Sequence, residues 1–255
     1  MKNCLTFLRE KLSFSKLELA LNTNMTVVQR GNLFVVSTPI GNLGDVTHRA
    51  IETLDKVSLI AAEDTRRTKI LLNRYEIKTP LSSYNSFNKI KKARDFIERL
   101  EKGNDLALVS DAGTPGISDP HYHLVNAAIE NGVSIYSIPG PSALLAALTV
   151  SGLPMDRFIF EGFLPRKKGR TTMLENLANE KRTIVIFESP NRIEKTLQDL
   201  YRFFGDRKVA ITRELTKMYE EVIRGNLEEL STVTRKWKGE ITVVIAGADK
   251  KKRKN

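Results

Sequence analysis

From residue 33 onward, short apolar runs alternate with longer stretches in which apolar residues recur at helical spacing. The runs have the length and composition of buried strands, and they cover 33–36, 59–62, 106–109 and 134–138. The amphipathic stretches predict helices over 47–57, up to 75, over 86–100, up to 131 and over 143–151. Strands and helices that alternate in this way predict a mostly parallel sheet with helices on both faces.

Within this pattern, the helix over 86–100 has a clear expected start and end. Ser86 is placed to cap it, and Phe87, Ile90, Ala93, Ile97 and Leu100 recur on one face. A glycine at 103 then ends the helix. We expect this face to be buried.

The second half of the chain again alternates expected strands and helices, with different loops between them. Strands are expected at 158–161, 183–187, 209–212, 222–224 and 241–246, with helices up to 203 and over 227–234. A Gly-Leu-Pro turn at 152–154 is the natural boundary. We therefore predict an N-terminal extension over 1–31 with an amphipathic helix at 5–21, α/β domains over 32–152 and 153–249, and a basic tail over 250–255.

Three strands of the first half end in long loops rich in glycine and proline, which begin at Thr38, Ser110 and Ile138. The loop that follows 106–109 runs to an expected helix start at Asp119 and Pro120, whereas such connections usually have ~2–6 residues. In open α/β sheets ligands bind beyond the carboxyl ends of the strands. The loops therefore predict one ligand cleft, with an ordinary connection as the alternative. None of them matches a dinucleotide or P-loop phosphate motif.

Charge and cysteine content narrow the class of protein. The net charge is +11 over 255 residues, and five of the basic residues lie in the tail at 250–254. Basic ends of this kind act as solubility elements or as nucleic-acid arms. Cys4 is the only cysteine, which excludes a disulfide scaffold, and the three histidines give weak grounds for zinc, so we expect no metal. No apolar run approaches the ~20 residues of a membrane helix, so we expect a soluble, cytoplasmic protein without membrane contact.

Six ordered strings carry more specific information: 38–45, 61–67, 110–120, 139–143, 161–165 and 213–217. Together they resemble the ribosomal RNA small subunit methyltransferase I family of the tetrapyrrole-methylase-like superfamily, over about residues 33–247. The resemblance implies a homodimeric class III methyltransferase whose two α/β domains hold S-adenosylmethionine in the cleft between them. It also implies methylation of the ribose 2′-oxygen of a cytidine in the decoding region of small-subunit ribosomal RNA, free or in the assembled subunit.

The resemblance further implies which residues contact the cofactor. In the first domain these are Pro39, Asp111, Gly113, Thr114, Ile117, Ser142 and Ala143. In the second domain they are Phe187, Glu214, Glu240 and Ile241. Thr114 replaces the aspartate of the Gly-Asp-Pro turn found in tetrapyrrole relatives, so the carboxylate role there passes to Asp111.

Methylation of a ribose hydroxyl in RNA is helped by a general base, and binding of the RNA phosphates by cations. A ribose hydroxyl is a weak acid, so a general base helps, and Glu63, Asp64 and Asp111 are the candidates beside the cleft. Arg66 is placed to bind the acceptor, and Arg67 to bind RNA phosphates. A salt-bridged turn over 63–67 is the alternative, as is catalysis by positioning alone. Arg166, Lys167, Lys168 and Arg170 form either a solvated turn or further phosphate contacts.

Two other functions remain open at this point. A methylase of a small tetrapyrrole needs an apolar open trough and no basic loop, which the cations at 66–67 and 166–170 disfavour. An RNA-binding module on the same fold need not bind S-adenosylmethionine, so calorimetry with the cofactor separates it from an enzyme.

Overall fold

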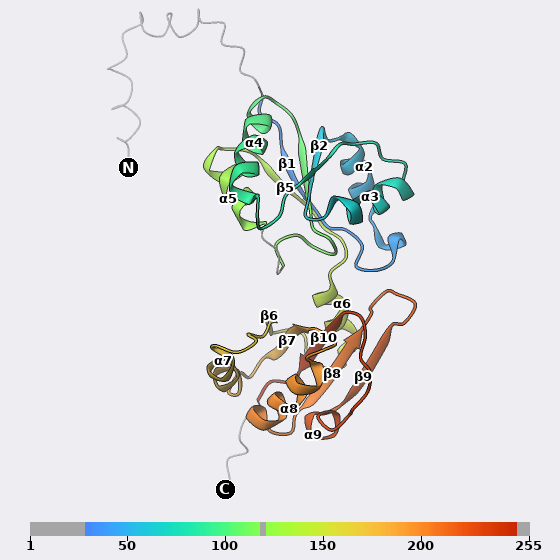
Figure 1. Ribbon diagram of the computed structural model, residues 1–255, viewed down its shortest axis with the longest axis vertical. Coiled ribbons are helices and arrows are strands. Elements are labelled where there is room, and N and C mark those ends of the chain that lie inside the picture. Colours follow the sequence, from blue (N-terminus) through green and yellow to red (C-terminus); the bar gives the residue numbers. More distant parts are fainter. Residues whose placement is uncertain (1–28, 118–120, 249–255) are drawn as a thin grey trace, which may run out of the picture.

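The computed structural model describes residues 29–117 and 121–248, and these form two lobes, each built on a five-stranded sheet (Figure 1). The helix expected at 5–21, the cap expected at Asp119 with Pro120, and the basic tail lie outside the described residues.

The first sheet has strand order β3-β2-β4-β1-β5, and every neighbouring pair is parallel. Its strands are β1 (Leu33–Val36), β2 (Leu59–Ala62), β3 (Leu81–Ser83), β4 (Leu106–Val109) and β5 (Ile135–Ile138). The predicted parallel sheet is confirmed. The sequence did not reveal β3, because its three residues include two serines and form no apolar run.

Helices cover both faces of this sheet, as predicted (Figure 1). One face carries α2 (His48–Lys56) and α3 (Thr65–Arg74), which follow the short η1 (Leu43–Asp45), and the other carries α4 (Lys89–Glu101) and α5 (Tyr122–Glu130). Leu54 and Leu71 pack against the first face, whereas Phe96 and Leu124 pack against the second. With both faces covered, the carboxyl edge of the sheet is the place for a ligand.

The start of α4 differs from the prediction. The helix begins at Lys89, and Ser86 does not cap it. Before it, the Asn85 side chain accepts from the Phe87 amide (3.1 Å) and the Asn88 side chain accepts from the Asn85 amide (2.9 Å), which holds the chain in a turn. Phe87 is therefore fully exposed instead of lying on the buried face of a helix.

The second sheet is mixed, with order β6-β7-β10-β8-β9, so the second half does not repeat the parallel style of the first. Only β6 and β7 are parallel, and the other neighbours are antiparallel. The strands are β6 (Phe158–Phe163), β7 (Thr183–Glu188), β8 (Lys208–Arg213), β9 (Glu221–Asn226) and β10 (Ile241–Ile245). The turn over 214–220 is too short for a crossover helix, so β8 and β9 pair as a hairpin.

Helices also cover both faces of the second sheet. Its first face packs against α7 (Arg170–Leu177), α8 (Ile193–Phe204) and α9 (Leu227–Leu230). Its second face packs against α6 (Ala143–Ser151), whose Leu144 and Leu148 belong to the same buried apolar cluster as Val185 and Val244. Helix α6 thus follows directly from the edge of the first sheet and packs on the second. The domain boundary at 152–154 stays a prediction, and this packing joins α6 to the second lobe.

Candidate active site

Three loops at the carboxyl edge of the first sheet are bonded to one another. Thr38 and Gly113 exchange two backbone hydrogen bonds, of 2.9 and 3.0 Å. The hydroxyl of Thr114 lies 3.0 Å from that of Ser37 and donates to the Pro141 carbonyl over 3.2 Å. The loops after β1, β4 and β5 therefore form one surface, as their sequences predicted.

Gly113 allows this close approach. Its φ is +80°, and a Cβ there would lie 3.3 Å from Cγ2 of Ile40 and 3.7 Å from the Pro141 carbonyl oxygen. A residue with a side chain would combine left-handed strain with a tight contact.

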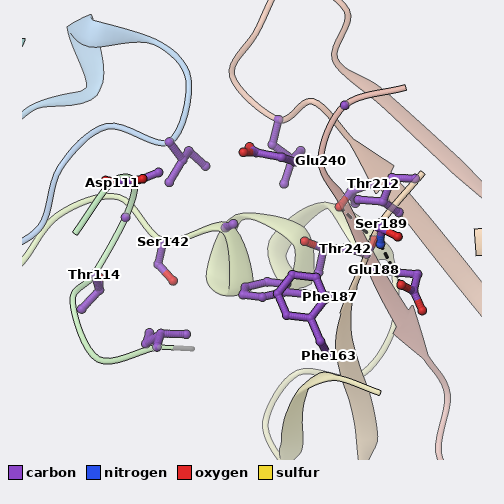
Figure 2. A pocket seen from close by; sticks show the side chains of 18 of the residues that line it. Asp111, Thr114, Ser142, Phe163, Phe187, Glu188, Ser189, Thr212, Glu240 and Thr242 are labelled. Carbon is purple, nitrogen blue, oxygen red and sulfur yellow. Dashed lines mark hydrogen bonds between the residues drawn. The ribbon is translucent and has the colours of Figure 1, made fainter. Parts of the chain in front are cut away.

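This loop surface faces the second sheet across a cavity of about 380 Å³. Figure 2 shows Asp111, Thr114 and Ser142 on one side of the cavity, and Phe187, Thr212 and Glu240 on the other. Nine of the eleven predicted cofactor residues line it: Asp111, Gly113, Thr114, Ile117, Ser142, Ala143, Phe187, Glu240 and Ile241. Pro39 and Glu214 are not among the lining residues. Ile40, next to Pro39, lines the cavity instead.

The cavity has an apolar wall and a polar end. The ring of Phe187 packs edge-on against Phe160 and Phe163, with centroids 4.8 and 5.8 Å apart. At the other end Ser142 precedes α6, and its side chain makes no capping bond to the helix. Aromatic rings suit an adenine base, and a helix N-terminus suits a carboxylate. The residues therefore fit S-adenosylmethionine.

Glu214 does not line the cavity but is bonded to Glu240, which does. Lys217 Nζ lies 2.8 Å from Glu214 and 2.9 Å from Glu240, and the Glu240 amide donates to Glu214 Oε1 over 3.0 Å. Glu214 is thus connected to the cavity lining through Glu240 and Lys217.

Sequence reasoning missed several lining residues of the second lobe: Phe163, Glu188, Ser189, Pro190, Thr212, Leu215, Gly239 and Thr242. Two of them carry a readable signal. Thr212 and Thr242 are buried polar residues inside otherwise apolar strands, and such positions commonly face a ligand or a polar partner. The others lie at or beside strand ends in a sheet whose order the sequence does not reveal.

The turn after β2 is partly a salt-bridged structural turn. Asp64 accepts from the Arg66 amide at the start of α3 (2.9 Å) and from the Arg66 guanidinium (3.0 and 2.7 Å). These bonds lower the pKa of Asp64 to about 2, so it is a weak base. Arg66 is engaged by the same contacts, and neither residue lines the cavity.

Glu63 has a different environment. Burial, and then the nearby charge of Asp111, raise its pKa above the ordinary value. Asp111 itself accepts from the Asp64 amide (2.9 Å) and lies 3.6 Å from Arg67 Nη1. Asp111 and Arg67 line the cavity, and Glu63 is close enough to both for their charges to affect its pKa. Among the residues of this turn, Glu63 is therefore the stronger proton acceptor.

The basic loop of the second lobe divides into two kinds of residue. Arg166, Lys167 and Lys168 are exposed. Arg170 is only 8% exposed, and its guanidinium is bonded to Asp199, Thr196 and the Pro165 carbonyl. The structure corrects the prediction that Arg170 is an exposed phosphate contact: it is a buried residue that anchors the start of α7.

Comparison with known proteins identifies the family. The Tetrapyrrole (Corrin/Porphyrin) Methylases family matches residues 32–231. The chain is 51% identical over 221 residues to ribosomal RNA small subunit methyltransferase I of Thermotoga maritima, which covers 86% of this chain and 100% of that protein. The chain belongs to the ribosomal RNA small subunit methyltransferase I family. The corresponding protein of a Synechocystis species is 50% identical over 222 residues, covering 86% of this chain and 80% of the relative.

This family consists of S-adenosylmethionine-dependent methyltransferases, so the predicted family, fold class and cofactor are confirmed. Among solved structures, uroporphyrin-III C-methyl transferase from Thermus thermophilus, complexed with S-adenyl homocysteine, has a TM-score of 0.59 and 16% identity. It covers 84% of this chain and 97% of that one. At this identity the likeness concerns the fold.

Two further findings concern other classes of site. Over 29–117 and 121–248, no group of three or more histidine, cysteine, aspartate or glutamate side chains is placed to hold a metal ion. Among the residues that the structure describes, no helix is long and apolar enough to cross a membrane.

Proposed function

We propose that this protein transfers a methyl group from S-adenosylmethionine to the ribose 2′-oxygen of a cytidine in the decoding region of small-subunit ribosomal RNA. The observation that supports it most is that nine residues expected to contact the cofactor line a single cavity between the two lobes. The chain is also 51% and 50% identical in sequence to two ribosomal RNA small subunit methyltransferases I. The cytidine and the 2′-oxygen come from the resemblance of the motifs.

In this proposal the residues between Phe187 and Ser142 would hold the cofactor. The start of α6 would bind its carboxylate, and the rings of Phe163 and Phe187 would contact its adenine. When bound, S-adenosylmethionine supplies an electrophilic methyl group. The cavity aligns it with the acceptor oxygen, and such alignment can contribute ~7–11 kcal/mol to lowering the barrier.

Glu63 is the proposed general base. It accepts the proton of the ribose hydroxyl while the carbon–oxygen bond forms and the carbon–sulfur bond breaks, so the proton ends on its carboxylate. Its raised pKa favours this role over Asp64, whose pKa of about 2 makes it a poor acceptor. Arg67, with its side chain 62% exposed at the cavity, is placed to bind a phosphate of the acceptor.

The acceptor is RNA in this proposal because exposed cations lie at the cavity and on the nearby loop. Arg67, Arg166, Lys167 and Lys168 are exposed, and phosphate contacts dominate RNA affinity. We further propose that the protein acts as a homodimer in the cytoplasm, where ribosomal subunits are available, and that free RNA and the assembled subunit are both candidate substrates.

A methyl-transfer assay with three acceptors tests the proposal. Purified protein and labelled S-adenosylmethionine are incubated with small-subunit ribosomal RNA, with assembled small subunits, and with a uroporphyrin-type tetrapyrrole. The proposal predicts label on RNA, resistant to alkaline hydrolysis at the modified ribose. Label on the tetrapyrrole alone would overturn it. Absence of cofactor binding by calorimetry would favour an RNA-binding module.

A further inference from the structure

A second cavity, of about 410 Å³, lies next to the first one and has a different character. Ser189 lines both cavities. Four of the residues around the second cavity are cations and none is acidic: Arg166, Arg170, Ser189, Asn191, Arg192, Lys195 and Thr196. A concave surface of one charge sign strengthens the field that it presents to an anion.

A buried carboxylate fixes one edge of this cavity. Glu188, at the end of β7, is 2% exposed and accepts from the Ser189 amide (2.7 Å) and the Thr196 hydroxyl (2.6 Å). Its other contact is Arg192, whose Nε lies 3.3 Å away. Arg192 also donates from Nη2 to the Leu164 carbonyl over 2.6 Å. The guanidinium is therefore held in one orientation.

The floor is fixed through the same network. Arg170 donates from Nη2 to the Thr196 hydroxyl (3.0 Å), which in turn donates to Glu188. Its Nε donates to Asp199 over 2.9 Å. Networks of this kind hold polar groups before a ligand arrives, which reduces the entropy lost on binding.

The exposed side of the cavity, its mouth, carries positive charge that no carboxylate of the described residues neutralises. Arg166 and Lys195 are exposed, and within 29–117 and 121–248 neither has an ion-pair partner. The two carboxylates of the network, Glu188 and Asp199, are bonded to the arginines at the floor and edge. The free cations at the mouth and the fixed guanidiniums below them suit a phosphate, which arginine binds bidentately.

We propose that this second cavity binds a backbone phosphate of the RNA beside the nucleotide that is methylated. The inference rests on the proposed function and adds a positioning site to it. A ribose is joined covalently to its phosphates, so a phosphate held beyond Ser189 fixes how far the neighbouring 2′-hydroxyl reaches into the cofactor cavity. Arg166, Arg192 and Lys195 contact the phosphate, and Arg170 acts through Thr196 and Glu188.

The test is a double substitution with a matched control. Arg166→Ala/Lys195→Ala removes the two exposed cations and leaves the buried network intact. Arg202→Ala/Lys208→Ala removes the same charge from exposed positions near the other end of α8, a helix about 18 Å long. We expect the first pair to weaken RNA binding by about 10–100-fold. Its salt slope, log Kd against log salt, should fall by about 0.7 for one single-stranded phosphate contact. Both pairs should bind S-adenosylmethionine as the wild type does.

Ethylation interference locates the phosphate. RNA that the wild type methylates is ethylated sparsely, which neutralises single phosphates, and bound and free fractions are sequenced. The wild type and the control pair should both lose affinity when one phosphate beside the methylated nucleotide is ethylated. The Arg166→Ala/Lys195→Ala protein, which keeps Arg192, should lose less.

The outcomes separate the two proposals. If the wild type does not methylate RNA, the proposed function fails. If it does, but the two double variants have equal RNA affinity and equal interference patterns, the phosphate cavity is refuted. If inorganic phosphate raises the melting temperature of the wild type but not of the Arg166→Ala/Lys195→Ala protein, and RNA affinity is equal in both, the cavity takes a free phosphate and the RNA assignment is overturned.

Discussion

Gly113→Ala tests whether the loop after β4 forms the cofactor site. The added Cβ would lie 3.3 Å from Ile40 Cγ2, in a backbone with φ of +80°. Left-handed backbone in a residue other than glycine costs about 1–3 kcal/mol, which lowers the melting temperature by roughly 2–12 °C for a chain of this size. Relief of the contact requires movement of Ile40 or of the Thr38–Gly113 pair, and both adjoin the cavity. We expect at least a ~10-fold loss of S-adenosylmethionine affinity, which is 1.4 kcal/mol.

Gly116→Ala is the matched control. Its φ is +91°, but a Cβ there has no neighbour within 4 Å, and Gly116 does not line the cavity. The control should lose similar stability and keep the cofactor affinity of the wild type. Calorimetry with S-adenosylmethionine and thermal unfolding measure the two effects separately. Wild-type affinity in a folded Gly113→Ala protein would remove this loop from the site. Equal losses of affinity in both variants would assign the effect to backbone strain.

Three further predictions concern Glu63 and Arg170. Glu63→Gln should reduce the single-turnover methylation rate by a factor of ~10²–10⁴, with RNA and cofactor affinities unchanged. Asp64→Asn keeps a capping side chain and should stay near the wild-type rate. Equal rates for both variants and the wild type would exclude a base in this turn. Because the folded state raises the pKa of Glu63, its contribution to stability is present when it is protonated and is lost as pH rises through that pKa. Glu63→Gln should therefore raise the melting temperature at neutral pH, and the difference should vanish on acidification; a constant difference would contradict the raised pKa. Arg170→Leu should cost about 3–5 kcal/mol in denaturant unfolding, since it strands Asp199 and Thr196, and a loss below 1 kcal/mol would refute its structural role.

Most of the first lobe was predictable because its inner strands β2 and β4 are buried on both faces. Runs such as 33–36 and 106–109 are almost wholly apolar, so their composition alone marks them. The start of α4 was not predictable, because Phe87 fits a helical face and yet the Asn85 and Asn88 side chains hold a turn there, so the helix begins only at Lys89. Ile90 lies in the first turn of the helix and is exposed as well. Local hydrogen bonds decided the boundary there.

In the second lobe, the strand positions were predictable from the sequence but the order of the strands in the sheet was not. Its strands were located within two residues, but β10 lies between β7 and β8 in the sheet, and the sequence contains no local record of that insertion. The cavity wall at Thr212 and Thr242 depends on this order, so these residues went unpredicted. Arg170 was misassigned for a related reason: its partners Asp199 and Thr196 come from α8, which the loop sequence does not reveal.

Nucleotide-resolution mapping of 2′-O-methylation tests the central claim most directly. Small-subunit ribosomal RNA is compared from cells with this protein, cells without it, and cells that carry only Glu63→Gln. The account predicts one methylated cytidine in the decoding region that is lost without the protein, restored by the wild type and not restored by Glu63→Gln. An identical methylation map in all these cells would contradict the assignment of this cavity to RNA ribose methylation.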